Sequence, residues 1–112
     1  MKSFEELFNE ITEWQENQFG KHNNPIPSYN HLIEEVQEVG EELDKENFRT
    51  PQLKIEITDC LMLLIGMYKR AFPDSSYKDI LIDLGVKLWR NKRRKWGKPD
   101  KLGIVKAVKE SC

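Results

Sequence analysis

The sequence predicts a single all-α domain, a four-helix bundle, and three observations support this class. Apolar residues recur at three- and four-residue spacing in four separate segments. Glycine, proline, asparagine and serine separate these segments, as is typical of helix ends and turns. No stretch shows a convincing strand pattern of alternating polar and apolar residues. A chain of 112 residues is expected to form one domain, spanning residues 1–112.

The first helix is expected over residues 3–19. Ser3 suits the N-cap position, because a serine hydroxyl can accept a hydrogen bond from a backbone N–H of the first turn. Gly20 is expected to end the helix, since glycine is common at helix C-termini. The residues at helical spacing are Phe4, Leu7, Ile11, Trp14 and Gln18.

Three further helices are expected, at residues 28–46, 51–72 and 75–96. Ser28 is suited to cap the second helix, and Ser75 or Ser76 to cap the fourth. Pro51 suits the first turn of the third helix. Short loops between successive helices favour antiparallel neighbours, and hence a bundle. Residues 97–112 are expected either to hold a short helix or to be a loose tail.

Charge is balanced overall but segregated along the chain. The net charge is −1, while acidic residues crowd positions 34–46 and basic residues crowd positions 87–98. This balance makes nucleic acid an unlikely partner. The two cysteines cannot form a disulfide framework, and the first residues lack the apolar core of a signal peptide. Because charged residues interrupt every long apolar run, no membrane helix is expected, and we predict a cytoplasmic protein.

The most apolar segment, residues 53–68, carries two carboxylates, Glu56 and Asp59, that share one face of the expected helix. Buried carboxylates are costly unless a cation pairs with them. Two bases of this helix, Lys54 and Lys69, lie more than a turn from Asp59 on that face. The carboxylates therefore need a partner from outside this helix.

On the preceding expected helix, residues 28–46, the glutamates lie at different angles from an apolar stripe. Glu35 and Glu38 border the stripe, whereas Glu34 and Glu41 point away from it. Four carboxylates on two antiparallel helices can therefore converge, and Mg²⁺ is a cation that takes carboxylate oxygens. Lys or Arg partners, or a merely solvated acidic face, are the alternatives. The stripe consists of Leu32, Val36, Val39 and Leu43.

Two acidic blocks in this order resemble the signature of the MazG-like, all-α nucleoside triphosphate pyrophosphohydrolases. The first is E-E-x-x-E, formed by Glu34, Glu35 and Glu38. The second, E-x-x-D, is formed by Glu56 and Asp59 after an interval of seventeen residues. The interval lies within the range of that family.

Two more blocks strengthen the resemblance. Residues 87–96 contain K-x-x-x-N-x-x-R-x-W, which looks like the family's phosphate block at a helix end. WQENQFG, residues 14–20, stands before a loop and HLIEE, residues 31–35, which is similar to the phage and bacterial dATP/dGTP diphosphohydrolase-like branch. The aspartate-glycine and histidine that often follow the tryptophan in the family are not evident, since Asp100 precedes Lys101.

The resemblance implies a helical bundle assembled as a homodimer or a dimer of dimers. It implies hydrolysis of a nucleoside triphosphate, dATP or dGTP, between the α and β phosphates, giving the monophosphate and pyrophosphate. Mg²⁺ would be the cofactor, with Mn²⁺ as a substitute. Either Glu35 or Glu38 is the candidate general base that accepts a proton from water. The implied metal ligands are Glu35, Glu38, Glu56 and Asp59.

Substrate contacts are expected on the first and last helices. Lys87, Asn91 and Arg94 form one helical stripe and are the candidate phosphate-binding residues, because cationic side chains complement phosphate oxygens. The candidate base-binding residues are Trp14, Gln18 and Trp96, although Trp14 is equally suited to core packing. The neighbouring bases are expected to face solvent: Arg90, Lys92, Arg93 and Lys95.

Two other functions remain open from the sequence. A pyrimidine nucleotide, dCTP or dUTP, is the alternative substrate within the same class. A non-catalytic helical interaction module, whose acids form surface salt bridges, is the alternative of a different class. His22 and His31 are expected to be polar surface residues and not metal ligands. The apolar cluster around residues 61–67 is expected to form core or an oligomer interface.

Overall fold

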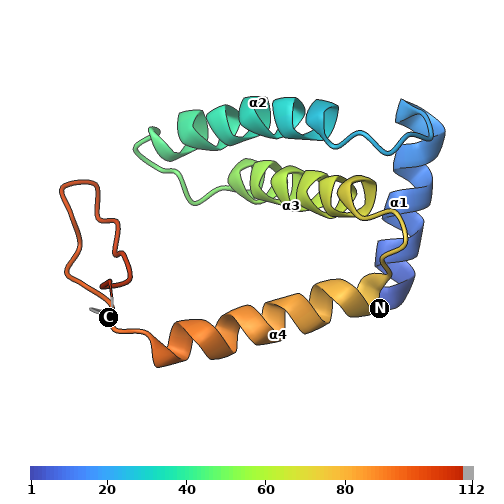
Figure 1. Ribbon diagram of the computed structural model, residues 1–112. Coiled ribbons are helices and arrows are strands. Elements are labelled where there is room, and N and C mark those ends of the chain that lie inside the picture. Colours follow the sequence, from blue (N-terminus) through green and yellow to red (C-terminus); the bar gives the residue numbers. More distant parts are fainter. Residues whose placement is uncertain (110–112) are drawn as a thin grey trace. The chain divides into compact units, whose positions relative to one another are not determined.

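The computed structural model describes residues 1–109, which form four α-helices (Figure 1). No strand occurs in this described part, where an isolated antiparallel bridge joins Trp96 and Ala107. The all-α prediction is therefore confirmed for the part of the chain that is described. None of these helices is long and apolar enough to cross a membrane. The helices are α1 (Phe4–Phe19), α2 (Ile26–Leu43), α3 (Pro51–Ala71) and α4 (Tyr77–Arg93).

The chain divides into two compact units, and each is described by itself. The first, residues 1–77, contains α1, α2 and α3. The second begins at Lys78 and contains nearly all of α4 and the segment that follows it. That the whole chain acts as one domain stays a prediction from the sequence.

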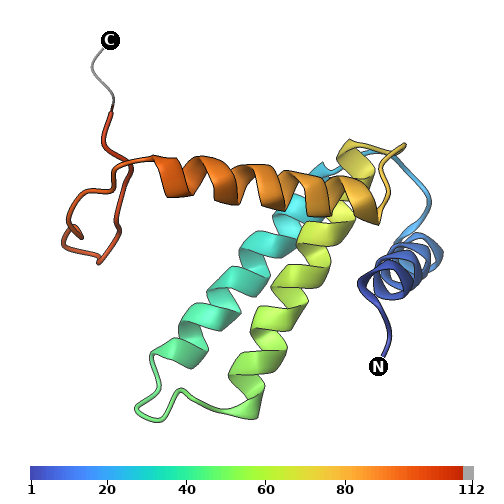
Figure 2. The same ribbon diagram turned by 90° about the horizontal axis from the view of Figure 1, so that it is seen from below.

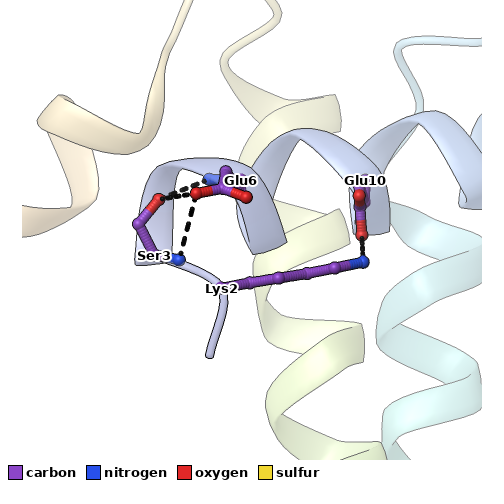
Figure 3. A network of polar contacts seen from close by, with 4 residues as sticks. All are labelled: Lys2, Ser3, Glu6 and Glu10. Carbon is purple, nitrogen blue, oxygen red and sulfur yellow. Dashed lines mark hydrogen bonds and ion pairs between the residues drawn. The ribbon is translucent and has the colours of Figure 1, made fainter.

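Helix α1 begins as the sequence predicts, with Ser3 as its N-cap (Figure 3). The Glu6 backbone N–H donates to the Ser3 hydroxyl at 3.2 Å, and the Ser3 N–H donates to the Glu6 carboxylate at 3.4 Å. This reciprocal pair is a capping box, which satisfies two backbone donors that the helix itself leaves unpaired. An ion pair between Lys2 and Glu10 also lies along this end. Gly20 ends the helix with φ of 90°, a conformation that glycine adopts without strain.

The predicted start of the second helix at Ser28 is wrong, because α2 begins two residues earlier. The helix begins at Ile26, where the Asn24 side-chain oxygen accepts a hydrogen bond from the Ile26 N–H at 3.1 Å. Pro27 stands in the first turn, where its fixed φ suits the helix and its missing N–H costs nothing. Ser28 is buried inside the helix and makes no N-cap hydrogen bond. The helix ends at Leu43, three residues before the predicted end.

Helix α3 matches the prediction closely. It begins at Pro51, and the Thr50 hydroxyl accepts a hydrogen bond from the Leu53 N–H at 3.3 Å. It ends at Ala71, one residue before the predicted end. The basic residues Lys69 and Arg70 stand in its last turn, where cations are favoured by the helix dipole.

Helix α4 is shorter than predicted at both ends, because it runs from Tyr77 to Arg93. The Ser75 hydroxyl has no hydrogen-bond partner and therefore does not cap it. After the helix the chain turns back on itself: the Gly97 N–H donates to the Lys106 carbonyl at 2.9 Å. This backbone pairing holds Trp96 outside the helix, and residues 97–109 contain no helix.

Helices α2 and α3 lie side by side in antiparallel directions, and α1 crosses α3 near the end where α2 begins (Figures 1 and 2). Phe8 on α1 is the fully buried large apolar side chain of the described residues, at 2% exposure. Gln15, also on α1, is buried against α3, where its Nε2 donates a hydrogen bond to the Met62 carbonyl at 3.0 Å. Gly66 permits this contact, because a Cβ there would lie only 2.4 Å from the Gln15 side-chain oxygen.

Candidate active site

Three carboxylates meet where α2 and α3 run alongside each other. Glu35 and Glu38 are three residues apart on one face of α2, and Glu56 projects from α3. One carboxylate oxygen from each lies within 4.8 Å of the other two. The structure thus brings together three of the four residues that the sequence proposes as metal ligands.

Two oxygens in this cluster lack a hydrogen-bond donor. Glu35 Oε2 and Glu56 Oε2 are buried without a hydrogen-bond partner. The other oxygen of Glu56 accepts a hydrogen bond from Gln52 Nε2 at 2.6 Å, and Glu35 Oε1 lies 3.2 Å from His31 Nε2. An unsatisfied buried oxygen destabilises a protein, more so when it carries charge. The donor set of three convergent carboxylates therefore fits a hard divalent cation, which takes oxygen ligands.

The pKa of Glu38 is the clearest sign of this crowding. Hydrogen bonding with Glu56, then with Glu35, together with the negative charge of Glu35, raises the pKa of Glu38 to about 7. Glu38 itself is exposed, so its neighbours and not burial are the main cause. A protonated Glu38 becomes a donor for the oxygens that otherwise lack one. At neutral pH the cluster therefore holds a proton part of the time, unless a cation replaces it.

Asp59, the fourth proposed ligand, stands one turn beyond Glu56 on α3 but outside the close cluster. It lines a cavity of about 200 Å³ together with Glu35. The negative field extends to Cys60, whose thiol pKa is raised by burial and further by the charges of the surrounding carboxylates. Beyond Asp59, the cavity is walled by α1, α2 and α3 through Trp14, Gln15, Phe19, His31, Met62 and Leu63.

A second cavity of about 130 Å³ adjoins the first. The two share Gln15, Phe19, His31 and Leu63 as lining residues, so they lie next to each other. The residues that only the second cavity has are His22, Pro27, Ser28 and Arg70. The two neighbouring cavities together are called the cleft. Glu35 and Asp59 line one end of it, and Arg70 lines the other.

The proposed base-binding residues of α1 are placed differently from one another. Trp14 lines the cavity beside Glu35, at 49% exposure, and its ring meets Phe19 edge to face at 5.6 Å. Gln18 lines neither cavity. Gln15 and Phe19, one turn apart, present the side of α1 that faces α3 and line both cavities.

Both histidines line the cleft, which the sequence does not suggest. His31 lines both cavities, and His22 lines the one that contains Arg70. The His22 ring accepts a hydrogen bond from the Asn24 N–H at 3.2 Å, which holds it in the loop before α2. The available signal was the position of His31 one helical turn before Glu35, on the same face of α2.

The proposed phosphate-binding residues belong to the second unit. Lys87 and Asn91 stand one turn apart on α4, and Arg94 follows the last helical residue. The Asn91 carbonyl accepts a hydrogen bond from the Trp96 indole N–H at 2.9 Å, so the third proposed base-binding residue is tied to the end of α4. The Asn91 side-chain oxygen is buried without a hydrogen-bond partner.

Comparison with known proteins gives one family. The family model described as dATP/dGTP pyrophosphohydrolase matches residues 7–112, which include the carboxylates, the cleft and the basic block. No curated protein and no solved structure matches the chain. The match confirms the resemblance predicted from the acidic and basic blocks. The chain belongs to the dATP/dGTP pyrophosphohydrolase family and is a hydrolase that acts on nucleoside triphosphates.

Proposed function

We propose that this enzyme hydrolyses a purine deoxynucleoside triphosphate between the α and β phosphates in the presence of Mg²⁺, releasing the monophosphate and pyrophosphate. The observation that carries the proposal is the convergence of Glu35, Glu38 and Glu56 within 4.8 Å, with two buried oxygens that lack a donor. Membership of the family supports the substrate and the reaction class.

Glu35, Glu38 and Glu56 would hold Mg²⁺, with Asp59 as the fourth ligand from the adjoining wall. Bound Mg²⁺ supplies charge neutralisation for phosphate oxygens and lowers the pKa of a coordinated water. Mn²⁺ would substitute, because carboxylate oxygens suit both ions. Glu35 or Glu38 is proposed to accept the proton of the attacking water, a role that favours a group with a pKa near the working pH.

The nucleotide would lie along the cleft. Trp14 is proposed to stack on the base or sugar, and its position in the lining of the cavity beside Glu35, half exposed, supports this proposal. Lys87, Asn91 and Arg94 are proposed to bind the phosphates, since metal ions cannot neutralise every phosphate oxygen. Gln18 and Trp96 are weaker proposals for base contacts: Gln18 lines neither cavity, and the Trp96 indole is bonded to Asn91.

The enzyme is proposed to work as a homodimer or a dimer of dimers in the cytoplasm. Apolar side chains of α3 are half exposed in the single chain: Ile55, Ile57, Leu61 and Leu64. Burying such a surface against a second copy would stabilise both subunits. The free thiol of Cys60 suits a reducing compartment.

The test is pyrophosphate release from a panel of deoxynucleoside and ribonucleoside triphosphates, with Mg²⁺, with Mn²⁺ and with a chelator. We expect release from dATP or dGTP that requires the metal and is lost in Glu56→Gln. Release mainly from dCTP or dUTP would mean that the substrate is a pyrimidine and not a purine nucleotide. No release, in a folded protein whose melting temperature ignores Mg²⁺, would instead support a non-catalytic interaction module.

A further inference from the structure

Arg70 is a cation beside a cavity with no acid to pair with. It lines the cavity of about 130 Å³, and among the described residues its guanidinium forms no ion pair with a carboxylate. Arg70 is partly buried in the last turn of α3, where the helix dipole favours a cation. Its positive charge is therefore available to a ligand in the cavity.

The guanidinium is held in place by two neutral acceptors. Arg70 Nη1 donates to the Ser28 hydroxyl at 2.9 Å, and Nη2 donates to the Gly20 carbonyl at 3.4 Å. Ser28 is 5% exposed, so this anchor is buried. A guanidinium has five N–H donors, and these two bonds leave three for other acceptors. Arg70 is thus positioned, but not saturated, at the wall of the cavity.

The position of Arg70 relative to the carboxylates matches the two ends of a nucleotide. On α2, Ser28 stands seven residues before Glu35, about 10 Å along the helix at 1.5 Å per residue. On α3, Arg70 stands eleven residues after Asp59, about 16 Å along the helix. His31 and Leu63 line the space between these ends, in both cavities. With its phosphates at the carboxylates, a nucleotide would direct its base toward Arg70.

The chemistry of arginine separates the two purines. A guanidinium only donates hydrogen bonds. Guanine presents two neighbouring acceptors, O6 and N7, on one edge, whereas adenine presents the N7 acceptor beside an N6 amino donor. Adenine at this wall would set its amino group against another donor. We propose that Arg70 reads the O6/N7 edge of the base, and that the enzyme therefore prefers dGTP to dATP; this inference rests on the proposed function.

The experiment measures kcat/KM for pyrophosphate release from dGTP, dATP, dITP and 7-deaza-dGTP. dITP keeps O6 and N7 and lacks only the 2-amino group, while 7-deaza-dGTP lacks the N7 acceptor. We expect the wild-type enzyme to prefer dGTP over dATP by roughly tenfold or more, to treat dITP much like dGTP, and to disfavour 7-deaza-dGTP. These four substrates test the proposal without any mutation.

Arg70→Gln then assigns the preference to a residue. Glutamine pairs with the N6/N7 edge of adenine, so we expect the dGTP to dATP ratio to fall by about tenfold or to reverse, and the 7-deaza penalty to disappear. Arg49→Gln is the matched control, because Arg49 lies over Phe48 in the α2–α3 loop and lines neither cavity. Its ratio should equal the wild-type ratio.

Three outcomes would overturn the inference. A wild-type preference for dATP, or equal rates with dGTP and 7-deaza-dGTP, would exclude reading of the O6/N7 edge. A fall of both rates in Arg70→Gln with an unchanged ratio would mean that Arg70 only holds α3 to the start of α2 and to Gly20. Hydrolysis in these cases leaves the proposed function standing, whereas no hydrolysis of any nucleotide by the wild type overturns both.

Discussion

The two ends of α3 present opposite chemistry: a carboxylate near the start and a guanidinium in the last turn. Near its start, Glu56 contributes to a cluster of negative oxygens, two of which are buried without a donor. Near its end, Arg70 contributes a guanidinium that is held by neutral oxygens and forms no ion pair with an acid of residues 1–109. The two ends therefore suit opposite ligands: the carboxylates suit a cation, and the guanidinium suits hydrogen-bond acceptors. A metal–nucleotide complex, as proposed above, would offer a cation to the first end and acceptors to the second, and this difference would set the direction in which the substrate lies.

The largest effect on activity is expected when a carboxylate of the cluster near the start of α3 is neutralised. Glu56→Gln keeps the size of the side chain and its contact with Gln52 but removes one negative charge from the proposed metal site. Changes to residues that only support metal ligands cost about 10- to 100-fold, so loss of a ligand should reduce kcat/KM by more than about 100-fold. Pyrophosphate release measures the effect.

Glu41→Gln is the control for that change, because Glu41 is an exposed glutamate of α2 outside the cluster. Its activity should match the wild type. If Glu56→Gln kept its activity within tenfold at all Mg²⁺ concentrations, the carboxylate end would not be the metal site.

The packing of α1 against the middle of α3, between these two ends, can be tested at Gly66. A Cβ at this position would lie 2.4 Å from the Gln15 side-chain oxygen, so Gly66→Ala must displace Gln15 from the Met62 carbonyl. Overpacking of this kind typically costs about 1–3 kcal/mol. Because Gln15 lines both cavities, KM should also rise. Denaturant unfolding and steady-state kinetics measure the two effects.

Gly40→Ala is a matched control in the neighbouring helix. Nothing lies within 4 Å of a Cβ at Gly40, so the change should stabilise α2 by about 0.5–1 kcal/mol through helix propensity alone. Equal effects of the two substitutions would mean that Gln15 moves aside freely and does not shape the cleft.

The pH dependence of stability sharpens the picture of the carboxylate end. The folded-state pKa of Glu38 is raised from its ordinary value of 4.5 to about 7. Between these values the folded state holds more protons than the unfolded state, so metal-free stability should fall as pH rises from about 4.5 to 7. Mg²⁺ should reverse this trend, because a cation displaces the proton and binds more tightly as pH rises.

Melting temperatures across this pH range, with and without Mg²⁺, measure the trend in the wild type and in Glu38→Gln. The neutral variant should lose the part of the pH dependence that Glu38 contributes. Identical profiles for the two proteins would show that Glu38 does not titrate in this window.

The sequence predicts the carboxylate end far better than the guanidinium end. Helical spacing puts Glu35 and Glu38 on one face of α2 and Glu56 on a face of α3, and the short loop between these helices predicts that they are antiparallel neighbours. Arg70 and Ser28 are 42 residues apart, and their hydrogen bond depends on how α2 and α3 are aligned. That alignment is a property of the packing, which no local pattern reports.

The same distinction explains the errors at helix ends. The helical class, the Ser3 cap and the start of α3 follow from local signals, and the structure confirms them. Ser28 was expected to cap α2 because serine favours that position, but its hydroxyl accepts a hydrogen bond from Arg70 instead. Trp96 was expected inside α4, but backbone pairing with Ala107 holds it in the turned-back segment. In both cases a long-range contact overrides a local preference.

The smallest expected effect comes from Ser28→Ala, which loosens the guanidinium end without removing it. The lost hydrogen bond to the charged Arg70 should cost about 1.5 kcal/mol, the low end for a charged group because Arg70 is partly exposed, and the better helix propensity of alanine offsets up to about 0.5 kcal/mol. Net destabilisation should therefore be about 1–1.5 kcal/mol in denaturant unfolding. The Gly20 carbonyl still anchors Arg70, so the dGTP to dATP ratio should fall less than in Arg70→Gln. A ratio that falls as far as in Arg70→Gln would show that the buried Ser28 hydroxyl alone aims the guanidinium.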